Sequence, residues 1–172
     1  MASLMENLID TLNKESSEYE LLLELSKKKT PFIIKSDLEN IQKITDEEQE
    51  VVSRITRLDK MRAEVTADIA NVLNKDVTQL KITNLVQMMA ARPQEQKQLS
   101  DACDKLQKAV HALQRVNEQN GELINHSLEL IEFDMNLLQA YKTAPQTANY
   151  DRGAGNAGGT MGVDRHGFDA KQ

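Results

Sequence analysis

The chain has 172 residues, enough for one domain with its own core, and a formal net charge of −6. The acidic balance argues against nucleic acid, which is bound largely through Lys and Arg, and against an anionic membrane surface. Aromatic residues make up only 3% of the sequence, and there is no Trp. Cores of Leu, Ile, Val, Ala and Met without rings are typical of long-helix bundles.

Several features bear on the cellular compartment. The single cysteine, Cys103, rules out an internal disulfide and fits a reducing cytosol. The first ten residues lack the basic region and apolar stretch of a signal peptide. No apolar run approaches the roughly 18 residues that a membrane-spanning helix needs. We therefore expect a cytoplasmic protein without stable membrane insertion.

The first predicted helix covers residues 4–29, where apolar residues recur in steps of three and four. Its middle, residues 13–18, is polar and interrupts the apolar stripe. Thr30 precedes Pro31, a position biased out of the helical region, so the helix is predicted to end before it.

The second predicted helix covers residues 38–73 and has no Gly or Pro inside. Ser36 and Glu39 have the spacing of a capping box, which predicts that Ser36 caps this helix. The following segment, residues 74–92, is less regular. In it, Thr83 is predicted to cap a short helix.

The third predicted helix covers residues 93–141 and begins at Pro93, a residue favoured in the first helical turn. Its apolar residues form a seam with alternating steps of four and three, in two stretches. The first stretch is Leu99, Cys103, Leu106, Val110 and Leu113, and the second is Ile124, Leu128, Ile131, Met135 and Leu138.

Polar residues interrupt this seam between the two stretches. Asn117 and Asn120 stand where apolar residues would continue it, and Gly121 is adjacent. The interruption indicates either a buried polar layer that fixes the register of the helices, or a groove or bend where a partner docks. The eleven residues from Leu113 to Ile124 are the spacing of a four-residue stutter, which locally unwinds a supercoil.

The second half of the third helix is apolar over a broader surface than one partner helix needs. Leu123, Leu130, Leu137 and Phe133 add a second apolar row beside the seam. Either helix one and the segment from Val86 to Met89 cover this surface, or it stays exposed for another protein.

After residue 143 the composition changes. Six of the seven Gly lie in the last 22 residues, and the segment 144–172 has no helical periodicity. We expect a helical domain, residues 1–143, followed by a flexible tail that is disordered when free. Four apolar residues of the tail are either chance scatter or a short motif that orders on binding. They are Tyr150, Met161, Val163 and Phe168.

The sequence offers no catalytic or cofactor motif. It has no metal-binding HExxH or CxxC pattern, no Walker loop and no GxGxxG that opens a helix. Cys103 falls on the apolar seam and is interpreted as a small core residue, not a nucleophile. We therefore expect neither an enzyme nor a bound metal or cofactor.

Three stretches of the chain carry recognisable motifs. The N-terminal half contains Glu15-x-x-x-Tyr19, the run from Lys35 to Ile44, then Glu48-Gln49 and Arg62. The third helix contains the run from Val116 to Leu128, and the tail contains Tyr150-Asp151-x-Gly153 and Val163-Asp164-Arg165. These stretches resemble the N-terminal half, the last helix and the tail of the FlgN family of flagellar export chaperones.

The resemblance implies a cytosolic chaperone for the hook-associated proteins, which form the hook–filament junction. Such chaperones bind the C-terminal helical part of the client, prevent premature assembly and deliver the client to the flagellar type III export gate. Client binding is expected in the C-terminal part of the last helix and in the tail. A tail tyrosine, here Tyr150, would contact the cytosolic domain of the gate. The expected client-binding residues are Leu123, Leu128, Leu130, Ile131, Phe133, Met135, Leu137 and Leu138.

The sequence as a whole predicts an all-α antiparallel three-helix bundle, resembling a coiled coil, with a very long C-terminal helix and a disordered Gly-rich tail. The expected oligomeric state is a monomer or a weak dimer. The alternative function is that of a structural coiled-coil protein that self-assembles. The broken seam and the Gly-rich tail favour the chaperone, because long uninterrupted heptads would favour self-assembly.

Overall fold

A computed structural model of the protein describes residues 3–143. Its contacts divide the chain after Met135 into two units, of which residues 3–135 and 136–143 are described. Each unit is considered by itself below. The predicted tail, residues 144–172, lies outside the described residues, and so does Tyr150.

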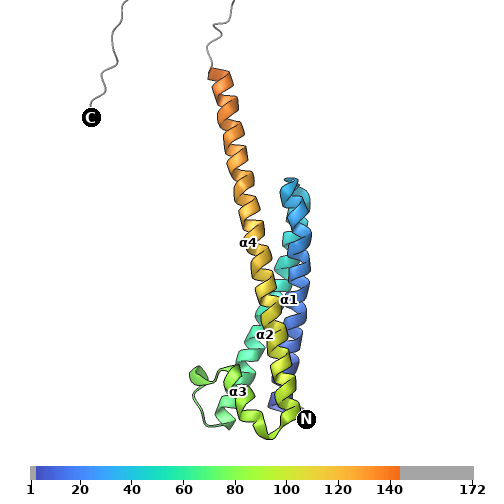
Figure 1. The fold of residues 1–172 in the computed structure, drawn as a ribbon, viewed down its shortest axis with the longest axis vertical. Coiled ribbons are helices and arrows are strands. Elements are labelled where there is room, and N and C mark those ends of the chain that lie inside the picture. Colours follow the sequence, from blue (N-terminus) through green and yellow to red (C-terminus); the bar gives the residue numbers. More distant parts are fainter. Residues whose placement is uncertain (1–2, 144–172) are drawn as a thin grey trace, which may run out of the picture. The chain divides into compact units, whose positions relative to one another are not determined.

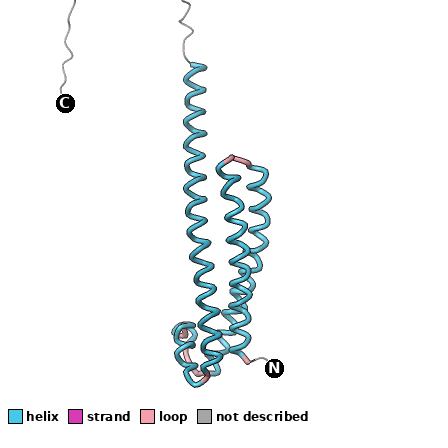
Figure 2. The backbone as a smooth tube through the Cα atoms, turned by 45° about the vertical axis from the view of Figure 1, so that its right-hand side comes forward, coloured by secondary structure: helices cyan, strands magenta, loops and turns pink. Residues whose placement is uncertain are grey.

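Three long helices build the first unit, as predicted (Figure 1). Helix α1 (Leu4–Ile34) is followed by α2 (Leu38–Val72), which runs back along it, and by α4 (Pro93–Thr143), whose residues up to Met135 belong to this unit. No strand occurs among residues 3–143 (Figure 2). The all-α three-helix bundle with a very long last helix is therefore confirmed.

Helix α1 continues beyond its predicted end and contains Pro31. Two adjacent features explain this difference. Proline fixes φ near a helical value, although it removes one helical hydrogen bond and its ring crowds the carbonyl four residues earlier. Ile33, one residue before the end of the helix, is only 2% exposed, and burying this side chain offsets that cost.

The turn between α1 and α2 also corrects a prediction. Ser36 adopts a left-handed conformation with φ 54°, and its N–H donates to the carbonyl of Ile33 at 3.0 Å. The next N–H, of Asp37, donates to the carbonyl of Phe32 at 2.9 Å, which completes a Schellman motif. Because Ser36 ends α1 in this way, Asp37 caps α2 instead, and its carboxylate accepts from the N–H of Asn40 at 3.2 Å.

Short helices connect α2 to α4. They are the 3-10 helix η1 (Val77–Gln79), helix α3 (Ile82–Met88) and the 3-10 helix η2 (Met89–Ala91). The predicted cap at Thr83 is wrong, because α3 already begins at Ile82 and its N-cap position, Lys81, makes no side-chain cap bond. What holds α3 in place is burial, since Leu85 is 1% exposed.

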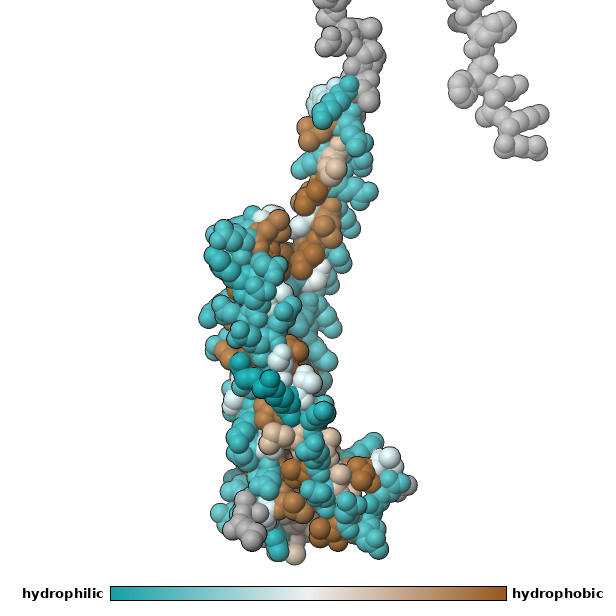
Figure 3. All heavy atoms as spheres, turned by 180° about the vertical axis from the view of Figure 1, so that it is seen from behind, coloured by the Kyte–Doolittle hydropathy of each residue, from teal (hydrophilic) through white to brown (hydrophobic). Residues whose placement is uncertain are grey.

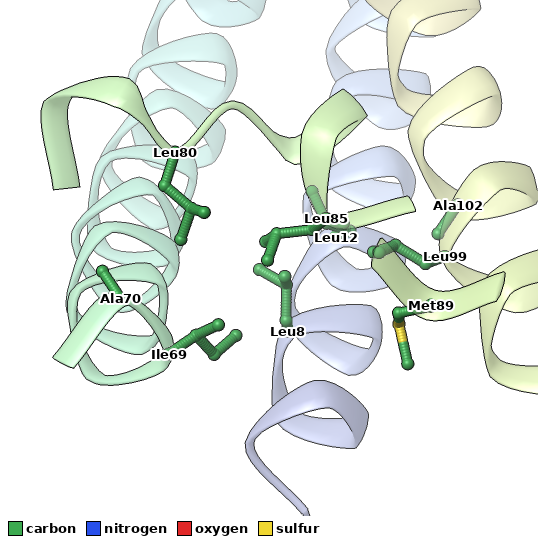
Figure 4. Packing of buried hydrophobic residues seen from close by; sticks show 9 residues of the cluster. All are labelled: Leu8, Leu12, Ile69, Ala70, Leu80, Leu85, Met89, Leu99 and Ala102. Carbon is green, nitrogen blue, oxygen red and sulfur yellow. The ribbon is translucent and has the colours of Figure 1, made fainter. Parts of the chain in front are cut away.

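Two hydrophobic clusters form the core of the first unit. The first cluster joins the start of α1, the end of α2, α3 and the start of α4 (Figure 4). Its buried residues are Leu8, Leu12, Ile69, Ala70, Leu80, Leu85, Met89, Leu99 and Ala102. The second cluster consists of Leu22, Leu25, Ile44, Val51, Ile55 and Leu113.

Buried polar side chains of α1 lie between the two clusters along the helix, where the sequence predicted an interruption of the apolar stripe. Glu15 is 2% exposed, and its carboxylate accepts from Nε of Arg62 on α2 at 3.2 Å. Arg62 also pairs with Asp59. Burial raises the pKa of the Glu15 carboxyl above its ordinary value, and the nearby Arg62 charge opposes that shift only in part.

A second polar contact joins α4 to α1. Asn120 is buried; its Nδ2 donates to the carbonyl of Ser26 at 2.9 Å, and its Oδ1 accepts from Oγ1 of Thr30 at 2.7 Å. Of the two alternatives for the interrupted seam, the buried polar layer is therefore confirmed at Asn120. Asn117, by contrast, is exposed, and a Cβ added at Gly121 would meet nothing within 4 Å.

We predict that Asn120→Ala destabilises the bundle by about 1–3 kcal/mol, because it removes both hydrogen bonds between α4 and α1 and leaves a gap at a buried position. Urea unfolding followed by circular dichroism measures the change. The matched control is Asn117→Ala on the same helix, which should change the free energy of unfolding by less than about 0.5 kcal/mol. Equal effects of the two substitutions would contradict the assignment of a structural role to Asn120.

We predict that Glu15→Gln changes how stability depends on pH. A carboxyl whose pKa is raised on folding contributes stability that is fully present below its unfolded pKa and is lost as pH rises through the folded pKa. Relative to the wild type, the Gln variant should therefore gain stability between about pH 4 and neutrality. Unfolding curves at a series of pH values measure this difference. The control, Glu18→Gln, alters the more exposed pair with Arg54, and parallel curves for wild type and Glu15→Gln would refute the prediction.

Candidate functional site

The place where α1 ends decides how much of α4 is covered in the first unit. The Asn120 contact sets Thr30 of α1 level with that part of α4. Only four residues, or about 6 Å of helix, remain between Thr30 and the end of α1 at Ile34. Since α4 runs in the same direction as α1 within the first unit (Figure 1), the residues of α4 from about Ile124 to Met135 have no neighbouring turn of α1 to pack against.

Side-chain exposure changes accordingly along α4. Leu113, the last seam residue of the first stretch, is 7% exposed, whereas Leu128 is 58% exposed. We call residues 123–135 the exposed apolar segment of α4. Its large hydrophobic residues are exposed except for Leu123, which is half-buried; the exposed ones are Ile124, Leu128, Leu130, Ile131, Phe133 and Met135.

The second unit, taken by itself, also exposes apolar side chains. Leu137 and Leu138 belong to the predicted client-binding residues, and both are exposed. Tyr141 is exposed as well. Tyr141 was not among the client-binding residues expected from the sequence. It lies next to Lys142 in the last helical turn.

The alternative that other parts of the bundle cover this surface is wrong for the described residues. Val86 and Met89 pack in the first core cluster beside Leu99, far along α4 from residue 123. Figure 3 shows hydrophobic side chains uncovered on α4 outside the bundle. Because monomeric proteins rarely expose contiguous apolar surface without a use for it, the exposed apolar segment is the candidate site for protein binding.

A second apolar surface lies between α3 and α4. Here Val86 of α3 and Leu106 and Val110 of α4 line a groove of about 450 Å³, with Leu12 at its floor. Cys103 also lines the groove, and burial raises the pKa of its thiol, which keeps the thiol protonated at neutral pH. The interpretation of Cys103 as a packing residue fits its place beside the first core cluster.

Two properties of the described residues bear on other classes of site. Within residues 3–143, no three His, Cys, Asp or Glu side chains come together so that they could hold a metal ion. Over the same residues, no helix combines the length and the apolar character that crossing a membrane requires.

The fold and the exposed segment define a class of protein: a helical bundle whose last helix leaves an apolar surface uncovered. The model of the FlgN protein family matches residues 1–158 of the chain. The chain therefore belongs to the FlgN family, and a general role as a flagellar export chaperone follows from that membership. No curated protein and no solved structure matches the chain.

Several residues that carry the resemblance to this family have structural roles here. Glu15 and Arg62 form the buried pair between α1 and α2. Glu48 accepts a hydrogen bond from Ser26 at 2.9 Å and pairs with Lys29. Asn120 joins α4 to α1. These polar contacts fix the relative positions of the helices and thereby determine where α4 loses its cover.

We predict that Leu130→Glu leaves the stability of the bundle within about 0.5 kcal/mol of the wild type, because the side chain has no core contact to lose. Leu113→Glu, on the same helix but within the second core cluster, should cost more than about 3 kcal/mol, because it buries a carboxylate among apolar side chains. Thermal and urea unfolding of both variants measure the difference. Global unfolding of Leu130→Glu would show that this side chain belongs to a core.

Proposed function

We propose that this protein is a cytosolic export chaperone that binds the C-terminal region of flagellar hook-associated proteins. In this proposal it prevents their premature assembly and delivers them to the flagellar type III export gate. The observation that supports the proposal is the exposed apolar segment of α4, on a chain that belongs to the FlgN family.

The spacing of the segment suits a helical client. Ile124, Leu128, Ile131 and Met135 follow the alternating four- and three-residue steps by which one helix packs against another. A client segment that is amphipathic and unpaired in its monomer can lay its apolar face along this seam and along the second row beside it, which includes Leu130 and Leu137. Burying a Leu, Ile, Phe or Met side chain contributes about 1.5–3 kcal/mol, so a few such contacts offset the cost of association.

Release of the client also agrees with such a surface. A client segment that folds only on binding loses conformational entropy, which lowers its affinity for a given contact area. Leu and Met side chains adapt to different partners, so one surface can serve more than one client. A chaperone that must release its client needs only moderate affinity, lower than that of a permanent complex.

Delivery to the gate is proposed to involve Tyr150. This residue lies outside the described residues, and its role is carried over from the resemblance of Tyr150-Asp151-x-Gly153 to the tail of the family. Binding of the client on α4 and contact with the gate through the tail would then use separate parts of the chain, so each can be tested without the other.

We predict that the full-length chain binds hook-associated proteins through their C-terminal segments at micromolar concentrations, and that Leu130→Glu with Leu137→Glu weakens binding at least about tenfold. Calorimetry with purified client measures this. The matched control is Val52→Glu, which places the same charge at an exposed apolar residue of α2 and should leave binding unchanged.

Two further results would decide between the proposals. If the wild-type chain binds none of the hook-associated proteins at these concentrations, the proposed client class is wrong. If sedimentation instead shows stable self-assembly of the free chain, the structural coiled-coil alternative is favoured. Tyr150→Ala should retain client binding and weaken binding to the purified cytosolic domain of the gate.

A further inference from the structure

The exposed apolar segment is flanked by acidic residues and by no Lys or Arg. From Val116 to Tyr141 the chain contains five carboxylate side chains and no Lys or Arg. Two of the five flank the seam directly: Glu132 follows Ile131, and Asp134 precedes Met135. At 100° per residue these positions lie at the two edges of the seam, where charged residues of packed helices meet their partners.

These two flanking carboxylates are not neutralised within the part of the chain that the structure describes. Both are exposed, and neither forms an ion pair with another described residue. Glu129, which lies further round the helix, is 3.4 Å from Nδ1 of His126. The segment therefore combines an uncovered apolar seam with an uncompensated carboxylate on each side of that seam. Glu132 lies on its outer side, and Asp134 lies between the seam and the second apolar row, which includes Leu130.

The packed helices of the same bundle show how such edges are satisfied. Glu18 of α1 pairs with Arg54 of α2 at 2.9 Å, and Glu20 of α1 pairs with Lys105 of α4 at 3.5 Å. In both cases a carboxylate beside a helix contact is matched by a cation on the facing helix. By the same electrostatics, the helix that faces Glu132 and Asp134 should carry Lys or Arg.

A second copy of this chain does not meet that requirement. In a parallel pair, each edge of the seam faces the opposite edge of the other copy with an offset of five residues, so Glu132 faces Ser127. In an antiparallel pair, each edge faces its own counterpart. Either arrangement sets carboxylates against carboxylates or against the neutral residues Asn125 and Ser127, and like charges at these edges are unfavourable.

We propose that the exposed apolar segment of α4 binds an amphipathic helix of another protein whose apolar stripe is bordered on both sides by Lys or Arg. This inference rests on the proposed function and adds the charge of the bound segment to it. The apolar seam supplies most of the affinity. The acidic edges select the partner and its register, and they make association depend on salt.

Two synthetic helical peptides test the proposal against the full-length chain. They share one Leu and Ile stripe and differ only in carrying Lys or Glu at the flanking positions. At low salt the Lys peptide should bind roughly tenfold more tightly, and the difference should shrink above about 0.5 M salt. Calorimetry or fluorescence anisotropy of labelled peptides gives both affinities.

A charge reversal on the chain provides the second part of the test. Glu132→Lys with Asp134→Lys should invert the preference, so that the Glu peptide binds more tightly. The matched control is Glu122→Lys with Glu129→Lys, which makes the same change in net charge on the opposite side of the same helix. That control should keep the preference for the Lys peptide, because its lysines do not border the seam.

The outcomes separate this inference from the proposed function. If both peptides bind equally at every salt concentration, the charge inference is wrong, while capture through the apolar seam stands. If neither peptide binds but hook-associated proteins do, the helical occupant is wrong. If neither peptides nor hook-associated proteins bind, both proposals fail. Self-association through this segment, detected by sedimentation and abolished by Leu130→Glu, would assign the segment to a second copy and overturn the inference.

Discussion

The contact between Asn120 and the α1 backbone is the constraint on which the first unit depends. The amide of Asn120 satisfies the carbonyl of Ser26 and accepts from the hydroxyl of Thr30, all within a largely apolar interface. A buried amide with two specific partners tolerates no sliding of one helix along the other, because any shift leaves polar groups unsatisfied. Since α1 ends four residues after Thr30, the same contact fixes the residue of α4 at which apolar cover stops.

Polar pairs elsewhere in the bundle serve the same end. Two sets of polar contacts join α1 to α2 near the second core cluster. One is the pair of Glu15 with Arg62, and the other joins Glu48 to Ser26 and Lys29. A buried carboxylate such as Glu15 adds little to net stability, because burial opposes its charged form and Arg62 offsets that effect only in part. Polar pairs of this kind need their partners opposite them, so they favour one register of α1 on α2.

The exposed apolar segment of α4 carries a risk of aggregation that a protein without a binding partner would avoid. Exposed Leu, Ile, Phe and Met side chains invite non-specific association. The first unit nevertheless keeps its own two clusters closed, so its stability does not depend on the exposed residues. Folding thus relies on the first stretch of α4, and the proposed partner binding would rely on the second. In that proposal, the carboxylates beside the seam would disfavour pairing of identical chains.

The sequence by itself determined that the chain is helical, where the long helices lie and that α4 is unusually long, because the periodicity of apolar residues and the place of Pro93 are local signals. It did not determine which residue ends α1 or caps α2, since burial of Ile33 and the left-handed turn at Ser36 outweighed the local preference at Pro31. Nor did it determine whether Leu128 or Ile131 was covered. The periodicity of the sequence indicates that one side of a helix is apolar, but it does not distinguish Leu113 from Leu128. Only the tertiary structure, by ending α1 where it does, made one of them core and left the other exposed.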